Sequence, residues 1–199
     1  MIAQRNPKKI YLSIDLDYWR YHTTPESCTS FFQQVWQLKL PVHVAAYHHH
    51  LLPHVNSFDC NTLINVDYHS DLCDLPAGRT IDFTEGTWIN FVDWRFWGTF
   101  TWRFPTTRCL NGRGGYCHVD RNPFEDASAA RWDKVQKRVG LWGIPWHRVK
   151  AVGVSVSPNW IGSAQVLMEP LSRLRITRWL KDYARQDESM RRRPKTVRV

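Results

Sequence analysis

The sequence predicts an α/β fold with a mostly parallel β-sheet. Three features of the first part of the chain predict it: an alternating apolar segment, a helix signature and two further apolar segments, in that order. A strand, a helix and further strands in this order are typical of parallel neighbours joined by a crossover connection. The 199 residues are enough for one sizeable core and few for two, so we expect one domain over residues 1–186 and a basic tail over 187–199.

The segment 10–17 predicts the first strand. Its apolar residues alternate with Ser13, Asp15 and Asp17. A period of two places these polar side chains on one face of a strand. The pattern therefore puts two carboxylates side by side at the end of this strand.

A helix and two strands are expected next. Thr24 and Pro25 are typical of the cap and the first residue of a helix, and an apolar stripe continues to Leu38. Residues 42–47 and 62–67 are apolar runs that follow a proline break and a polar connection. They predict the second and third strands.

The second half of the chain is less regular. Residues 88–118 are rich in aromatic residues and glycine, which predicts irregular loops or a hairpin beside the sheet. Residues 126–139 predict a helix, because apolar residues lie on one face and Gly140 follows. Residues 149–156 predict a late strand, and residues 170–185 predict a final helix.

Acidic and imidazole side chains follow the three predicted strands of the first half. In an open α/β sheet, ligands bind outside the carboxyl ends of the strands, so we expect these side chains to meet at one edge. Clustered carboxylates are costly there unless a cation neutralises them. The candidate metal ligands are Asp15, Asp17, His48, Asp67, His69 and Asp71.

The types of these side chains indicate two divalent cations rather than one. Four carboxylates with two imidazoles carry too much negative charge for a single closed zinc site. They suit two cations about 3.5–4 Å apart, bridged by carboxylates and a water molecule. Oxygen-rich ligation with some imidazole favours Mn²⁺ over zinc. The sequence therefore predicts a binuclear metal centre used for hydrolysis.

Two segments resemble metal-binding motifs of the arginase/ureohydrolase superfamily. Residues 67–71 resemble its Asp-x-His-x-Asp motif, and residues 13–17 resemble its Ser-x-Asp-x-Asp segment. The strings at 47–53 and 65–71 are similar to the family that includes the peptide arginases of ribosomal peptide natural-product pathways. Those enzymes convert arginine residues to ornithine and release urea. The likeness covers the first half of the chain.

The resemblance implies an arginase-like three-layer sandwich, with residues 1–186 as the catalytic domain and an arginine-containing precursor peptide as the partner. The two motifs occur here in the reverse of the order found in ordinary arginases, which implies a permuted strand order. The resemblance also assigns metal-ligand positions to Asp15, Asp17, His48, Asp67, His69 and Asp71.

The chemistry implied by the resemblance needs further residues. A cationic guanidinium needs an opposing carboxylate, for which Glu85 is the candidate, although a solvated loop residue fits equally. Asn90 could help to orient the substrate. The leaving group needs a proton donor, and His49, His50 and His118 all remain open for that role. The catalytic candidates are Asp71, Glu85 and His49.

Two other functions are compatible with parts of the sequence. A metal-dependent amide hydrolase or deacetylase would use one zinc ion, which the four aspartates argue against. A basic RNA-binding protein would explain the net charge of +9 and the 11 tryptophans, but strand-end aspartates would repel phosphate. A peptide substrate is favoured because the tryptophans between 88 and 102 could line an open groove and because the chain is shorter than ordinary arginases.

The cysteines and the hydropathy bear on the cellular setting. The five cysteines show no spacing typical of a metal site, and their number is odd. No segment resembles a signal peptide, and no apolar run reaches membrane length. We therefore expect a reduced, cytoplasmic setting and no membrane partner.

Overall fold

The computed structural model describes residues 8–19, 25–72, 83–96, 99–105 and 135–157. Within them lies a six-stranded sheet in the order β2-β6-β1-β3-β4-β5, and every strand pair is parallel. The predicted α/β class and parallel sheet are confirmed. Outside the described residues lie His118 and the rest of 106–118, residues 126–134 of the predicted helix, residues 170–185 and the tail 187–199.

The order of the strands in the sheet differs from their order along the chain. The strands and α-helices are β1 (Ile10–Asp15), α1 (Pro25–Gln37), β2 (Val42–Ala45), α2 (Leu52–Ser57), β3 (Thr62–Val66), β4 (Thr101–Phe104), β5 (Gln136–Val139) and β6 (Val149–Ser155). Short 3₁₀ helices are η1 (Leu16–Trp19), η2 (His48–Leu51), η3 (Trp88–Phe91), η4 (Trp94–Phe96) and η5 (Trp146–Arg148).

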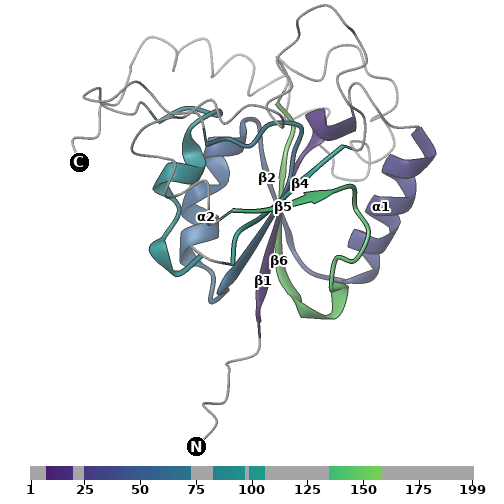
Figure 1. Ribbon diagram of the computed structural model, residues 1–199. Coiled ribbons are helices and arrows are strands. Elements are labelled where there is room, and N and C mark those ends of the chain that lie inside the picture. The colour runs from purple at the N-terminus through teal and green to yellow at the C-terminus, as the bar shows by residue number, and fades with distance from the viewer. Residues whose placement is uncertain (1–7, 20–24, 73–82, 97–98, 106–134, 158–199) are drawn as a thin grey trace, which may run out of the picture.

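Helices cover both faces of the sheet. In Figure 1, α1 lies on one side of the strands and α2 on the other. The side chains of β1 alternate between the two cores that result, as expected for a strand. Leu12 belongs to the core that contains Phe32 of α1, and Tyr11 belongs to the core that contains Val55 of α2. This is the three-layer arrangement.

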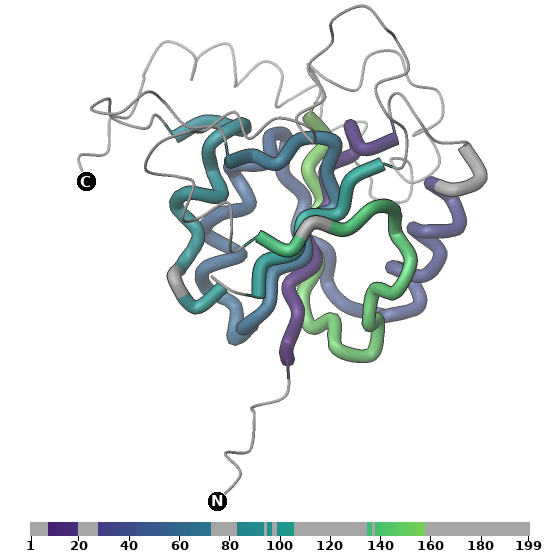
Figure 2. Tube along the Cα trace, viewed as in Figure 1, coloured from purple at the N-terminus to yellow at the C-terminus, as the bar shows by residue number. Residues whose placement is uncertain are grey.

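The register of the strands brings their carboxyl ends to one level. β1 lies between β6 and β3 in the middle of the sheet, although β6 comes last among the described strands (Figure 2). Asp15 of β1 pairs with Ser155 of β6, and Ser155 also pairs with Ala45 of β2. Ile14 of β1 pairs with Val66 of β3. The residues that follow these strands therefore emerge beside one another.

The first strand is shorter than predicted. β1 ends at Asp15, and residues 16–19 form the 3₁₀ helix η1. The backbone N–H of Asp17 donates to Oδ1 of Asp15 at 3.0 Å, which stabilises this turn. The prediction that Asp15 and Asp17 share one strand face is therefore wrong, because the chain turns between them.

Two strands differ from the predictions for the second half of the chain. Thr101–Phe104, within the aromatic stretch predicted as loops or a hairpin beside the sheet, is β4 and lies between β3 and β5. Gln136–Val139, predicted as the end of a helix, is β5 and pairs with β4. Hydrogen bonding to a neighbouring strand outweighs the local pattern here, because strand formation depends strongly on tertiary context.

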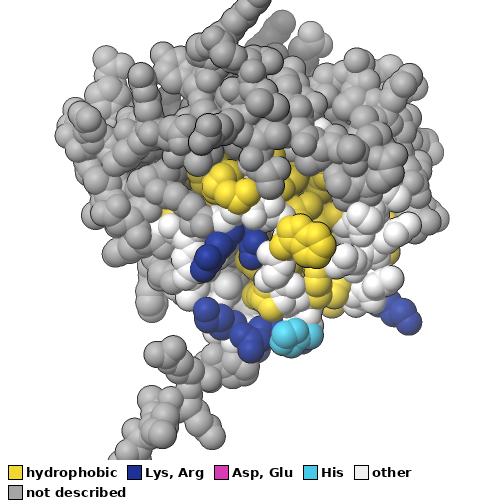
Figure 3. All heavy atoms as spheres, turned by 45° about the vertical axis from the view of Figure 1, so that its right-hand side comes forward, with side chains coloured by type: hydrophobic (Ala, Val, Ile, Leu, Met, Phe, Trp, Pro, Cys, Tyr) yellow, Lys and Arg dark blue, Asp and Glu magenta, His cyan; other side chains and the backbone are white. Residues whose placement is uncertain are grey.

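The surface of the described residues carries both basic and apolar side chains. On the face in Figure 3, Lys and Arg side chains are visible among the described residues, and no Asp or Glu side chain is. The large apolar residues exposed within the described part are Val139 and Trp142. No helix in the described segments combines the length and the apolar composition needed to cross a membrane.

Candidate metal centre

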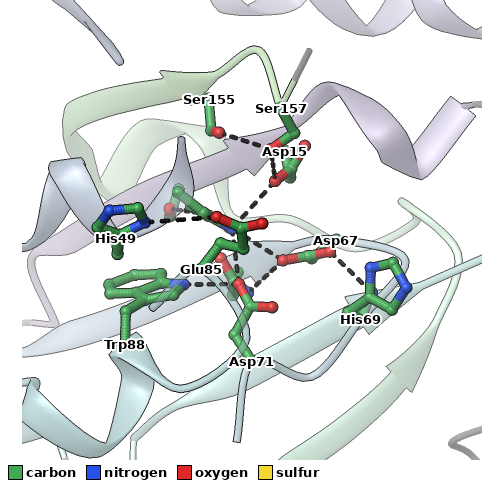
Figure 4. A network of polar contacts seen from close by, with 12 residues as sticks. Asp15, His49, Asp67, His69, Asp71, Glu85, Trp88, Ser155 and Ser157 are labelled. Carbon is green, nitrogen blue, oxygen red and sulfur yellow. Dashed lines mark hydrogen bonds and ion pairs between the residues drawn. The ribbon is translucent and has the colours of Figure 1, made fainter. Parts of the chain in front are cut away.

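The first group of predicted ligands gathers at the carboxyl ends of β1, β2 and β3. Asp15 is the last residue of β1, His48 opens η2 shortly after β2, and Asp67 follows β3 directly. Their exposed fractions are 4%, 0% and 1%. One ligand atom from each lies within 4.8 Å of the others. Residues from three separate strand ends thus form one buried cluster, and Figure 4 shows Asp15 and Asp67 within it.

The imidazole of His48 points into the carboxylates. Its Nδ1 lies 2.8 Å from Oδ2 of Asp67, 2.8 Å from Oδ2 of Asp71 and 3.4 Å from Oδ2 of Asp15. None of these contacts has the geometry of a hydrogen bond. The other ring nitrogen, Nε2, is held by Oγ of Ser13 at 2.7 Å. A buried nitrogen aimed at several carboxylate oxygens, with its ring fixed from behind, fits a divalent cation.

A second group shares one residue with the first. Asp17, Asp67 and His69 bring their ligand atoms within 4.8 Å of one another. Nδ1 of His69 lies 2.9 Å from Oδ2 of Asp17, and the backbone N–H of His69 donates to Oδ1 of Asp67 at 2.7 Å. Two ligand groups joined by a common carboxylate are the arrangement of a binuclear centre. These residues could hold two cations.

Burial and mutual repulsion destabilise the charged carboxylates. Burial, and then the charges of Asp17 and Asp67, raise the pKa of Asp15 well above its ordinary value. Burial and Asp67 raise the pKa of Asp17. Burial and Asp71 raise the pKa of Asp67 to about 6. A bound cation would remove this cost, because it stabilises the ionised form of each group.

The pKa values of the two histidines are also raised. Burial alone would lower the pKa of His48, but the close carboxylates of Asp67 and Asp71 outweigh burial and raise this pKa well above its ordinary value. For His69, the hydrogen bond to Asp17 outweighs burial and raises the pKa to about 9. Without a metal the cluster retains protons that a cation must displace.

Two serines at the end of β6 hold Asp15 in place, and no pattern in the sequence predicts this contact. Oγ of Ser157 donates to Oδ2 of Asp15 at 2.5 Å, and Oγ of Ser155 lies 3.0 Å from Oγ of Ser157. Ser157 has a φ of 47°, in the left-handed region that is uncommon for residues other than glycine. The two partners lie 142 positions apart. The only sequence signal is that Ser157 closes a predicted strand.

Asp71 is fixed by η3. Nε1 of Trp88 donates to Oδ2 of Asp71 at 2.6 Å, and the backbone N–H of Ile89 donates to the carbonyl oxygen of Asp71 at 3.3 Å. Asp71 also has a left-handed φ, 53°. It belongs to neither three-residue ligand group, although its Oδ2 faces His48. Asp71 therefore lies beside the first group.

Asp67 has two further contacts from the interior. Nδ2 of Asn65 donates to Oδ2 of Asp67 at 3.3 Å. Nε1 of Trp102 donates to the carbonyl oxygen of Asp67 at 3.1 Å. The side chain and the backbone of Asp67 are thus both held by β3 and β4.

The proposed substrate residues lie at the edge of this cluster. Oε2 of Glu85 is 3.9 Å from Nδ1 of His49 (Figure 4). The side chain of Glu85 is 36% exposed and that of His49 is 16% exposed, so Glu85 faces solvent more than His49 does. The ring of His50 lies 4.1 Å from that of His49. Nδ2 of Asn90 donates to the carbonyl oxygen of Thr87 within its own turn.

Two tryptophans of the predicted groove lie in the interior instead. Trp88 and Trp102 are both 0% exposed and belong to the core on the α2 side of the sheet. The groove prediction is therefore wrong for these two residues, because their rings fill the interior.

Comparisons with family models, with curated proteins and with solved structures found no significant match. A parallel α/β sheet that carries a buried His/Asp cluster at its strand ends suggests a metal-dependent hydrolase.

Proposed function

We propose that the protein is a binuclear metal-dependent hydrolase. The observation that carries the proposal is that Asp67 belongs to both ligand groups. Two divalent cations bound there would supply Lewis acidity and make water nucleophilic near neutral pH. The oxygen-rich ligand set with imidazole favours Mn²⁺.

The reaction proposed is that of a ureohydrolase. The likeness of residues 13–17 and 67–71 to the superfamily's motifs supports this choice. The oxygen of water adds to the guanidinium carbon of arginine, the bond from that carbon to the side-chain nitrogen breaks, and a proton reaches the leaving amine. Urea and ornithine result. Glu85 would pair with the cationic guanidinium, and His49 beside it would supply the proton.

The substrate proposed is arginine within a peptide rather than the free amino acid. The support is the similarity of residues 47–53 and 65–71 to peptide arginases. The buried Trp88 and Trp102 add no support, since they line no groove.

Incubation with Mn²⁺ and either free arginine or an arginine-containing peptide tests this proposal. We expect urea to be released and the peptide to lose the mass of one CN₂H₂ unit. Unchanged peptide mass and no urea from the metal-loaded protein would reject the ureohydrolase. A higher kcat/KM for free arginine would reject the peptide alone.

A further inference from the structure

The buried Trp88 contacts His48 of the first ligand group and Asp71, which lies beside that group. Trp88 is 0% exposed, and its indole N–H donates to Oδ2 of Asp71 at 2.6 Å. Its ring also packs against the ring of His48, with the centroids 4.7 Å apart and the planes tilted by 44°. Oδ2 of Asp71 and Nδ1 of His48 are themselves 2.8 Å apart. Trp88 therefore lies against both members of this pair, and Figure 4 shows its contact with Asp71.

The carboxylate of Asp71 needs such support. Its backbone has the left-handed φ of 53°, which a non-glycine residue keeps only when its surroundings hold it. The backbone N–H of Ile89 binds the carbonyl oxygen of Asp71, and Trp88 binds its side chain, so η3 fixes both.

We propose that Trp88 is a positioning residue, which sets the orientation of the Asp71 carboxylate and the His48 ring at the first cation position. This inference rests on the proposed metal centre. Removal of the indole N–H frees Oδ2 of Asp71 to rotate, and removal of the indole surface loosens His48. Partners behind a ligand typically change metal affinity by about 10–100-fold when they are lost.

The chain provides a control for core packing in Phe100. This residue is 2% exposed and belongs to the same core as Trp88. It lies directly before β4, at the amino end of that strand, whereas the ligand groups lie at the carboxyl ends of the strands. Leucine at position 100 reduces core packing at a distance from the ligands. Comparison of Trp88→Phe with Phe100→Leu therefore separates ligand positioning from core packing.

Titration of the wild type, Trp88→Phe and Phe100→Leu with Co²⁺ tests the inference. The visible absorption of Co²⁺ reports the geometry of its ligands, which core stability alone does not change. We expect Trp88→Phe to bind Co²⁺ about 10–100-fold more weakly with an altered spectrum. We expect Phe100→Leu to keep the wild-type spectrum. Wild-type binding in Trp88→Phe, or the same loss in both variants, overturns the inference.

The wild-type titration distinguishes the two proposals. If the wild type binds no Co²⁺, both the metal centre and this inference are overturned. If the wild type and Trp88→Phe bind Co²⁺ equally well, the inference alone is overturned. If Trp88→Phe does not fold, Asp71→Asn supplies the test by NMR. One indole N–H resonance should shift in Asp71→Asn, and that same resonance should shift when Zn²⁺ is added to the wild type. If no indole resonance responds to both, the inference is wrong.

Discussion

Asp67 is 1% exposed, and its two carboxylate oxygens face different partners. Oδ2 lies 2.8 Å from Nδ1 of His48, and Oδ1 accepts the backbone N–H of His69. An ionised group in this position is stable only when charge and hydrogen bonds compensate it. Because both ligand groups include Asp67, its loss affects both cation positions.

Asp67→Asn should abolish binding of the cation pair, with affinity reduced by more than about 100-fold, because the shared ligand loses its charge. Metal analysis after gel filtration in Mn²⁺, with circular dichroism as the check on folding, measures this. Asp59→Asn is the control, since the side chain of Asp59 is 91% exposed and pairs with Lys9. Full metal content in Asp67→Asn would reject the binuclear centre, and one tightly bound ion in the wild type would favour a single-metal amide hydrolase.

The three consecutive histidines should differ in their effects. His48→Ala should lose metal and activity, because His48 is buried and its Nδ1 faces three carboxylates. His49→Ala should keep its metal, because His49 lies at the rim beside Glu85, and should lose only turnover. Metal content and kcat of the two variants give the comparison. The reverse order would show that His49 is the ligand.

The sequence predicts which aspartates and histidines come together, but it does not predict the residues that fix their side chains in place. Asp15, His48 and Asp67 could be found because each follows a recognisable apolar strand. Ser157 and Trp88 could not, since no local pattern links a serine or a tryptophan to an aspartate elsewhere in the chain. Such contacts depend on the strand order, which the sequence does not reveal.

The strands differ in how well their sequences predict them. β3 and β6 are buried apolar runs, as is typical of central parallel strands, and β1 is predicted by the alternation of apolar residues with Ser13 and Asp15. β5 consists of Gln-Lys-Arg-Val at the end of the sheet, where Gln136, Arg138 and Val139 are exposed. A strand at this position needs no apolar run, so its sequence is compatible with a helix until its pairing with β4 is known.

Close packing between β6 and η2 provides a prediction at the scale of elements. A Cβ atom at Gly153 would lie 2.6 Å from Oη of Tyr11 and 3.0 Å from Cδ1 of Leu51. Tyr11 and Leu51 are fully buried, and η2 begins with His48. Gly153→Ala should therefore displace η2, reducing stability by about 1–3 kcal/mol and also weakening metal binding.

Gly143→Ala is the matched control for this change. Gly143 has a φ of 75°, and no atom lies within 4 Å of an added Cβ. The substitution should cost about 1 kcal/mol through backbone strain and leave metal affinity unchanged. Urea unfolding and Mn²⁺ titration of both variants separate the two effects. Unchanged metal affinity in Gly153→Ala would show that η2 does not depend on this contact.

For the whole molecule, overall charge and site charge have opposite signs. The chain has a net charge of +9, whereas the cluster at the strand ends contains Asp15, Asp17, Asp67 and Asp71. Among the described residues, the ion-pair partners of these carboxylates are His48 and His69 rather than lysine or arginine. The basic residues of the described segments therefore do not take the place of a cation in the site.

The metal-free protein should lose stability as the pH rises. The pKa of Asp67 is raised from 3.8 to about 6 by burial and Asp71, so its stabilising effect is complete below pH 3.8 and is lost as the pH rises through about 6. The pKa of His69 is raised from 6.5 to about 9 despite burial, by hydrogen bonding to Asp17, so its effect is complete below pH 6.5 and is lost through about 9.

Both shifts have the same sign, so the free energy of unfolding in a chelator should fall between pH 5 and pH 8. Added Mn²⁺ should reverse this dependence, because cations bind the deprotonated ligands and their affinity rises with pH. Urea unfolding at both pH values, with and without Mn²⁺, measures the effect. Asp67→Asn should reduce the pH dependence in chelator, since it removes one of the shifted groups. A metal-free protein that is as stable at pH 8 as at pH 5, with no response to Mn²⁺, would contradict a cluster built to hold cations.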